Sequence, residues 1–578
     1  MKEYSGIVIS ALCFVLSIVF SVHFGLQAQG ADIVLRNGVI QTMVNENDVH
    51  EAVAIQDGEI IYVGNDTDVE EYIGSNTEVI DLNGQMVTPG FMDSHIHSVG
   101  TKLTELYQIS LYGLKTLDEY KKAITDFIAA HPEMEIAVGG TFDINLFKVG
   151  DKTVFDRSIL DNISTTQAIG LNDVSGHALW ANSKALEIMG VDKNTPEENG
   201  CIIDKDANGE LTGYLVDCWD FYDKLTVEYT DEQIETASLA FYEQASIYGV
   251  TGVQAMIHDG FGVDSSAFLT NLDEQEKMSI RMNIAYTLQP GTTVEEALKA
   301  LEENSKSTSN LVTNKSVKMF YDGVTEGGSA LMLEPYKEAA GKGDNWYGGD
   351  SIWPKEEFQK MVVALDKAGY QINVHAIGDR SVREVLDAFE LAQKTNGKRD
   401  SRHVLIHDCT VSEEDRARFS ELGVIAAYQF LWMYKDPLYE LEKAFVGEER
   451  ALAFYPIKIL HDLNTIITGG SDSPVTDFNP LEQIEVGVTR NSPYPGEEDT
   501  DMYRWKDQAL TPYQMLEIYT KNVAYQMFLD DEIGTIEVGK KADVVVLSDN
   551  ILKIDPKKIS DVKVQYTIVD GNIVYQAN

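Results

Sequence analysis

The sequence predicts an α/β protein: a (β/α)8 barrel with an inserted subdomain and a flanking small β-sandwich built from both chain ends. Three observations lead to this prediction. Short apolar strands alternate with helical patterns through the middle of the 578-residue chain. Short β-rich stretches with Asn-Gly and Asp-Gly turn signals lie at both ends. Polar, chemistry-bearing residues recur where the middle strands end.

The two chain ends have the same β-rich texture. Runs of β-forming residues near the start are separated by Asn37-Gly38 and Asp57-Gly58, and those near the end are broken by Asp570-Gly571. We therefore expect residues 31–86 and 534–578 to form the two parts of one β-sandwich.

The middle of the chain, residues 87–533, is predicted to be the barrel. Pro354 opens a helical pattern that Gly369 ends, and the strand-like run 371–375 follows. Because parallel strands need such crossovers, the alternation predicts a parallel sheet. The stretch of about 101–235 is too long for one crossover, so we expect an inserted subdomain there. The candidate strands lie near 87–94, 250–255, 281–287, 317–321, 371–375, 403–407, 424–428 and 464–468.

The N-terminal region, residues 1–30, contains a nearly continuous apolar run from residue 7 to 26. Its length suits an uncleaved membrane anchor, whereas the small residues Ala28-Gln29-Gly30-Ala31 favour cleavage of an export signal. The sequence predicts an exported protein, secreted or in the cell envelope, or one tethered to a membrane by residues 7–26.

The composition argues against nucleic acid as a partner and against a disulfide scaffold. The formal charge of −47 would repel nucleic acid and anionic membrane surfaces. Cys201, Cys218 and Cys409 are too few for a disulfide scaffold, although Cys201 and Cys218 could pair in an oxidising compartment. Self-association into a homo-oligomer stays open.

Four histidines mark predicted strand ends. His95 and His97 alternate along one strand, which points both imidazoles to one face and gives half a metal site. His375 and His407 each end a predicted strand, where barrel active sites are built. His403 shares the face of His407 but lies nearer the start of that strand, so we interpret it as structural.

Two further residues complete the candidate metal chemistry. Asp472 ends the last apolar strand, where a carboxylate can bind a metal and accept a proton from water. Lys318 lies within an apolar strand, and a buried lysine needs pairing, neutralisation or modification. Carbamylation would make it an anionic bridge between two ions; a salt bridge with Asp322 is the alternative.

At these residues the chain resembles the amidohydrolase superfamily, and within it the large family 3 branch that includes N-substituted formamide deformylases. The match runs nearly end to end. The segments that carry it are VTPGFMDSHIH at 87–97, SGHALWANSKAL at 175–186, VKMFYDGVTEGGSAL at 317–331, INVHAIGDRSV at 372–382, RHVLIHD at 402–408, GGSDSPV at 469–475 and GTIEVGKKADVVVL at 534–547.

The resemblance implies one or two divalent ions, Zn²⁺ before others, that activate water for attack on an amide, N-acyl or N-formyl bond of a small molecule. It implies Asp472 as ligand and general base, Lys318 as a carbamylated bridge, and His177 as a substrate or oxyanion contact. The sequence departs from relatives at Met256 and at residues 140–143, which puts the substrate in doubt. The implied metal ligands are His95, His97, Lys318, His375, His407 and Asp472.

Other functions fit the same scaffold. Deamination and ester or lactone hydrolysis use the same metal chemistry, although the run His375-Ala376-Ile377-Gly378 lacks the glutamate expected after the corresponding run of a purine deaminase. A non-catalytic exported binding protein is the alternative from a different class, and no missing ligand supports it.

Overall fold

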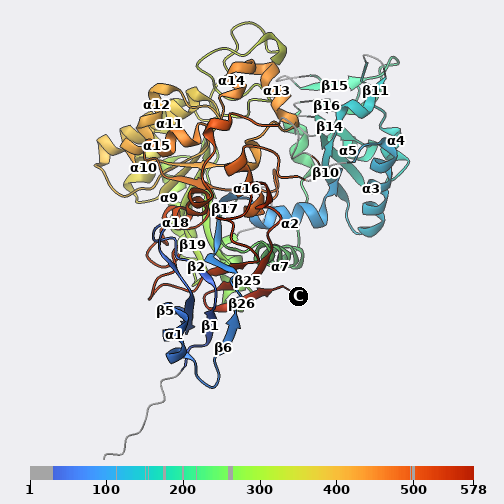
Figure 1. Ribbon diagram of the computed structural model, residues 1–578. Coiled ribbons are helices and arrows are strands. Elements are labelled where there is room, and N and C mark those ends of the chain that lie inside the picture. Colours follow the sequence, from blue (N-terminus) through green and yellow to red (C-terminus); the bar gives the residue numbers. More distant parts are fainter. Residues whose placement is uncertain are drawn as a thin grey trace, which may run out of the picture.

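The computed structural model describes residues 30–111, 114–149, 152–153, 155–173, 178–197, 201–216, 218–257, 265–494, 496 and 502–577. At its centre, eight parallel strands form one sheet that curls into a near-closed barrel (Figure 1). This confirms the predicted α/β class and barrel. In ring order the strands are β8 (Phe91–Ile96), β17 (Val250–Ile257), β18 (Arg281–Thr287), β19 (Val312–Phe320), β20 (Gln371–Ala376), β21 (Val404–His407), β22 (Ile425–Tyr428) and β23 (Ile467–Gly469).

Helices cover the outside of the barrel and shield its apolar outer surface. The predicted helix after Pro354 is present, and it buries Phe358, Met361, Val362 and Leu365 against the strands. The outer helices are α2 (Ser98–Tyr107), α7 (Asp231–Ile247), α8 (Ser265–Glu274), α9 (Val294–Asn304), α10 (Lys355–Lys367), α11 (Asp379–Asn396), α12 (Glu413–Leu422), α15 (Ile457–Asp462), α16 (Pro480–Thr489), α17 (Pro512–Tyr519) and α18 (Lys521–Gln526). Helices α13 (Pro437–Val446) and α14 (Glu448–Leu452) lie between β22 and α15 along the chain.

The first and last strands, β8 and β23, meet at a seam that lacks a regular ladder. The Asp472 N–H donates to the His95 carbonyl at 2.8 Å, and the His97 N–H donates to the Ser473 carbonyl at 3.0 Å. The Asp93 carboxylate also accepts from the Ser471 N–H, at 3.0 and 3.2 Å to its two oxygens. The chain segments that close the barrel therefore carry three of the predicted metal ligands.

The predicted first strand, 87–94, is divided in two. Its first half lies in β7 (Met86–Pro89), which belongs to the flanking sheet, and only β8 enters the barrel. The break falls at Gly90, where a Cβ atom would lie 2.1 Å from the Thr251 hydroxyl oxygen. A close approach that only glycine permits thus lets one extended run serve two sheets.

Two flanking sheets pack against each other around one apolar core below the barrel (Figure 1). The six-stranded sheet joins strands from both chain ends, and Arg281 at the start of β18 ties it to the barrel through Asp543, 2.7 Å away. Its order is β26 (Asn572–Gln576), β25 (Val564–Val569), β24 (Val544–Leu547), β7, β2 (Val39–Gln41) and β3 (Val49–His50). The four-stranded sheet has the order β5 (Glu59–Gly64), β4 (Ala52–Gln56), β1 (Ile33–Arg36) and β6 (Glu78–Asp81).

A separate six-stranded sheet occupies the chain between α2 and α7, beside the barrel (Figure 1). It has apolar clusters on its two faces, and a disulfide joins Cys201 to Cys218 at one of its edges. Its order is β15 (Ile202–Lys205), β16 (Leu211–Val216), β14 (Ala178–Ala181), β13 (Ala168–Asp173), β10 (Ile136–Phe142) and β9 (Ile109–Ser110), and its helices are α3 (Leu117–Ala130), α4 (Ser158–Asp161), α5 (Ser183–Met189) and α6 (Trp219–Tyr222).

The predicted export or anchor segment, residues 1–30, lies almost wholly outside the described residues. Across the part of the chain that the structure describes, we find no helix with the length and apolar character needed to cross a bilayer.

Candidate metal centre

The barrel brings six of the seven predicted site residues together at the C-terminal edge of its strands. The seventh, His177, lies outside the described residues. His95 is in β8, with His97 directly after it, and Asp472 follows β23 across the seam. Lys318, His375 and His407 are in β19, β20 and β21. In a (β/α)8 barrel this edge is where catalytic side chains converge.

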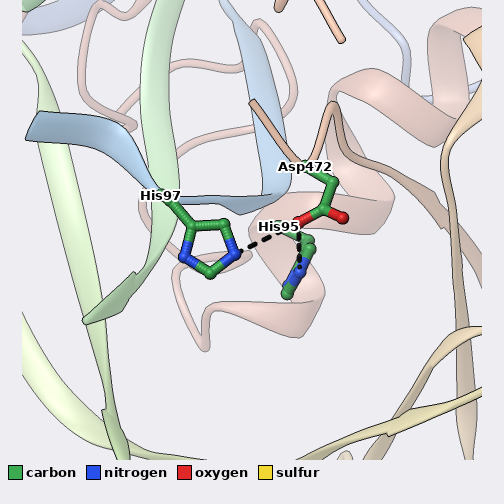
Figure 2. Close-up of side chains that lie close together, drawn as sticks. All are labelled: His95, His97 and Asp472. Atoms are coloured by element: carbon green, nitrogen blue, oxygen red, sulfur yellow. Dashed lines mark ion pairs between the residues drawn. The ribbon is translucent and has the colours of Figure 1, made fainter. Parts of the chain in front are cut away.

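His95, His97 and Asp472 form the tightest group (Figure 2). The Asp472 Oδ1 atom lies 3.0 Å from His95 Nε2 and 3.2 Å from His97 Nε2. Two imidazole nitrogens and a carboxylate oxygen that all lie within 4.8 Å of one another match the donor set of a divalent metal. The His97 side chain is 21% exposed, so the group is open to solvent on that side.

The His407 ring joins this group from the far side. It lies 5.3 Å from the His95 ring and 4.5 Å from the His375 ring, measured between centroids. Its backbone φ is +81°, and Asp472 has φ +57°. Such values are costly for residues other than glycine and persist where the surrounding structure enforces them, often at functional sites.

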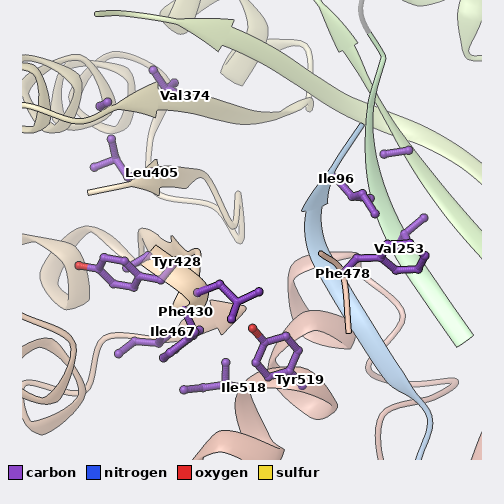
Figure 3. Packing of buried hydrophobic residues seen from close by; sticks show 14 of the residues in the cluster. Ile96, Val253, Val374, Leu405, Tyr428, Phe430, Ile467, Phe478, Ile518 and Tyr519 are labelled. Atoms are coloured by element: carbon purple, nitrogen blue, oxygen red, sulfur yellow. The ribbon is translucent and has the colours of Figure 1, made fainter. Parts of the chain in front are cut away.

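The positive φ of His407 explains why His403 and His407 do not share a face, contrary to the sequence prediction. Val404 and Ile406 contact residues of β17 and β18 across the ring, so they point into the barrel. Leu405 therefore points outward and lies in the outer apolar layer with Val374 (Figure 3). Simple alternation would turn His407 outward as well, but its backbone rotation brings the imidazole inside.

His403 is held outside the barrel by ordinary structural bonds. The Ile372 N–H donates to its Nδ1 at 3.1 Å, and its Nε2 lies 3.2 Å from Asp366 Oδ1. Its ring stacks on Phe389. With both nitrogens paired, His403 has no lone pair left for a metal.

His375 and His407 have opposite tautomers, which their hydrogen-bond partners impose. His375 Nε2 lies 3.2 Å from the Gly323 carbonyl oxygen, which can only accept, so Nε2 carries the proton and Nδ1 keeps its lone pair. His407 Nδ1 lies 2.7 Å from Gln429 Oε1, so here Nδ1 carries the proton and Nε2 is the free donor atom. Each ring thus has one nitrogen available to a metal.

Burial keeps these imidazoles neutral. Desolvation, followed by the nearby Lys318 charge, lowers the pKa of His95 to about 3 and that of His375 to about 4. Desolvation and the neighbouring His375 also hold the pKa of His407 well below its usual range. Neutral imidazole is the form that binds metal, so the rings are ready to act as ligands near neutral pH.

Asp472 stays ionised among these neutral rings. Burial would raise the pKa of its carboxyl, but the hydrogen bonds that the His95 and His97 rings donate to it hold that pKa well below the usual value. Asp93, on the same strand as His95, behaves in the opposite way, because burial raises its pKa to about 7. The anionic charge of the site is therefore concentrated on Asp472.

Lys318 is fully enclosed, and its amine contacts the site. Its Nζ lies 3.5 Å from His95 Nε2 and 4.6 Å from the centre of the Phe320 ring. Burial lowers the pKa of this amine to about 7, against the opposing effect of Asp472. Within the described residues no ion pair joins Lys318 to Asp322, so the salt-bridge alternative is wrong.

The Asp322 carboxylate instead connects the loops that follow β19 and β20. It accepts backbone N–H groups of Leu331, Ile377 and Gly378 at 2.9–3.0 Å, and the Ser381 hydroxyl. Asp322 thereby fixes the peptide next to Gly323, whose carbonyl sets the tautomer of His375.

Sequence reasoning missed three residues that surround His407. Gln429 bonds its Nδ1, and Trp432 stacks on its ring at 5.1 Å. Asp408 follows it, and both of its carboxylate oxygens are buried with no hydrogen-bond partner among the residues that the structure describes. The rule that found the histidines, polar residues directly after a strand, also applies to Gln429 and Asp408. Trp432 gave no comparable signal.

A model of the amidohydrolase family matches residues 78–575, which is most of the chain. Among curated proteins, the chain is similar to YtcJ of Bacillus subtilis (strain 168), which is named as an amidohydrolase. The two sequences are 28% identical over 544 residues, and the alignment covers 93% of this chain and 98% of that protein. It is 24% identical over 559 residues to the N-substituted formamide deformylase of Arthrobacter pascens, covering 95% of this chain and 99% of that protein.

Among solved structures, an uncharacterised metal-dependent hydrolase from Pyrococcus horikoshii OT3 superposes with a TM-score of 0.72. The sequence identity is 24%, and the superposition covers 91% of this chain and 99% of the other. This likeness establishes that the two chains share a fold.

Proposed function

We propose that this chain, which belongs to the amidohydrolase family, is a metal-dependent hydrolase of carbon–nitrogen bonds. It would cleave an N-acyl or N-formyl amide of a small molecule at the His95–His97–Asp472 centre. The observation that carries the assignment of the site is the convergence of both Nε2 atoms on one carboxylate oxygen. The name of the Arthrobacter relative supports the choice of an N-formyl or N-acyl substrate.

We propose Zn²⁺ as the metal, because a set of neutral imidazoles and one carboxylate suits this ion. His95, His97 and Asp472 would hold one ion. His375 through Nδ1 and His407 through Nε2 would hold a second, with Lys318 as a carbamate between them. Bound Zn²⁺ lowers the pKa of a water molecule toward about 7 and polarises a carbonyl.

The protein's own groups would handle the protons. Asp472 Oδ1 faces the two imidazoles, and its second oxygen, Oδ2, is the atom we assign to accept a proton from the attacking water and to pass it to the departing nitrogen. The low pKa of this carboxyl ensures that it begins the cycle as a base. The Phe320 ring contacts the His375 ring and the Trp432 ring stacks on His407, so each imidazole has an aromatic neighbour.

Elemental analysis of the purified protein, paired with hydrolysis assays on N-formyl, N-acyl, ester and amidine substrates, tests this function. We expect about two equivalents of Zn²⁺ and amide cleavage that chelation removes and Zn²⁺ restores. Preferential cleavage of esters or amidines would replace the amide assignment. Absence of metal and of metal-restored turnover on every substrate would overturn the hydrolase and leave a binding protein.

We also propose that the protein is exported, through residues 1–30. The Cys201–Cys218 disulfide supports this, because such bonds persist in oxidising compartments. Fractionation of the source cells, with N-terminal sequencing of the mature chain, tests it. Recovery of the protein only from the cytosol, with both thiols reduced, would contradict export.

A further inference from the structure

Gln429 is the first residue after β22, and its side chain enters the metal site from behind His407. Its amide oxygen lies 2.7 Å from His407 Nδ1, and the residue is only 1% exposed. Its amide nitrogen is also buried, yet it has no hydrogen-bond partner among the described residues. Leaving such a donor unpaired costs free energy, so the orientation of this amide needs a compensating benefit.

The benefit lies in which nitrogen of His407 keeps a lone pair. With the amide oxygen toward Nδ1, that nitrogen must carry the proton, and Nε2 is left free. The reverse orientation would pair the amide N–H₂ with Nδ1 and place the proton on Nε2. Only the first arrangement gives His407 a donor atom on the side away from Gln429.

Among the described residues, no other contact of His407 selects its tautomer. Trp432 lies parallel to the ring, with an angle of 10° between the planes, and restrains its tilt. His95 and His375 approach with ring angles of 89° and 68°. These contacts confine the plane of the imidazole, but a ring flipped by 180° within that plane would satisfy them equally.

We propose that Gln429 is the positioning residue of the metal centre: it fixes His407 as the Nδ1–H tautomer and directs Nε2 toward the metal. This inference rests on the proposed function. Outer groups that orient metal-binding histidines typically contribute 10–100-fold to metal affinity. Gln429 can be tested directly, whereas the partner of His375 is a backbone carbonyl that no substitution removes.

The experiment measures Zn²⁺ affinity by competition with a chromophoric chelator, independently of turnover. Gln429→Leu removes the acceptor at similar volume, Gln429→Asn withdraws it by one methylene, and Gln429→Glu keeps it. We expect about 10–100-fold weaker binding at the site for the Leu and Asn variants. The Glu variant should stay within about tenfold of the wild type, because it retains an acceptor for Nδ1–H.

Asp366→Asn is the matched control, because Asp366 is the acceptor for His403, the structural imidazole just before the same strand. It should leave Zn²⁺ affinity unchanged. Equal affinity of the wild type and both Gln429→Leu and Gln429→Asn would overturn the proposal, as would equal losses in these variants and the control. If one variant does not fold, the other decides. A wild-type protein that binds no Zn²⁺ would instead overturn the proposed function.

Discussion

Two groups of buried polar side chains, at opposite ends of the barrel, differ in how completely they are hydrogen-bonded. Toward the N-terminal end of the strands, three buried glutamines saturate one another: Gln254 donates to Gln371, Gln526 donates to Gln254, and Gln371 donates to two backbone carbonyls. At the C-terminal end, His95 Nδ1 and the Asp408 carboxylate are buried without a hydrogen-bond partner in the described part of the chain, and His407 uses one nitrogen only there.

The difference separates groups that hold the barrel together from groups that await a ligand. A buried polar group with all its bonds made contributes to stability, whereas an unpaired one costs free energy. Among the described residues, unpaired buried atoms also occur near the strand starts, for example Asn283 Oδ1 and Asn314 Oδ1. At the C-terminal end, however, they lie beside the predicted metal ligands, so there the lack of a protein partner and the identity of the side chains together mark the candidate site.

Asp472→Asn at the active end should give the largest effect. We expect kcat/KM for amide hydrolysis to fall by about 10³-fold or more, because the variant loses an anionic ligand and a proton acceptor together. The thermal midpoint of the metal-free protein should fall only modestly, because the variant weakens the side-chain contacts of Asp472 with His95 and His97 but keeps the backbone hydrogen bonds across the seam. If steady-state kinetics showed that more than a tenth of the activity survived, the role assigned to Asp472 would be wrong.

Gln371→Leu, near the N-terminal end of the barrel, should instead lower stability and leave metal binding unchanged. The change removes the oxygen that accepts from Gln254 and Ser316, and the N–H groups that donate to the carbonyls of Arg402 and Gln526. The free energy of unfolding should therefore fall by about 3 kcal/mol. Zn²⁺ bound per folded chain should equal that of the wild type. Urea unfolding measures the first quantity and elemental analysis the second; a loss of metal at unchanged stability would break the distinction between the ends.

Carbamylation of Lys318, at the C-terminal end of the barrel, should depend on pH. The lysine pKa of about 7, lowered by burial from 10.5, means that the amine is mostly neutral above pH 7 and charged below it. Only the neutral amine reacts with carbon dioxide, and the reaction releases a further proton, so forming the carbamate from the charged amine releases two protons. Carbamate in metal-free protein at constant dissolved ¹³CO₂ should therefore fall about 100-fold from pH 6.5 to 5.5. ¹³C NMR detects it, with Lys318→Met as the blank. A signal that ignores pH, or that persists in the blank, would exclude Lys318 as the bridge.

Much of this architecture was predictable because its signals are local. Strand and helix periods locate the eight barrel strands, and position at a strand end identifies the histidines and Asp472. Three features were not predictable. Gly90 divides one apolar run between two sheets, the φ of His407 overrides alternation, and Gln429 meets His407 only in space. Each depends on contacts between segments far apart in the chain.

The seam between β8 and β23 has a consequence for how the protein is made. His95 and His97 are synthesised early and Asp472 late, and their peptides bond to each other only when the barrel closes. A chain still emerging from the ribosome therefore lacks a complete set of ligands until nearly the whole barrel has been translated. In the proposed metal centre, capture of the ion would therefore follow closure of the barrel as a late step of maturation.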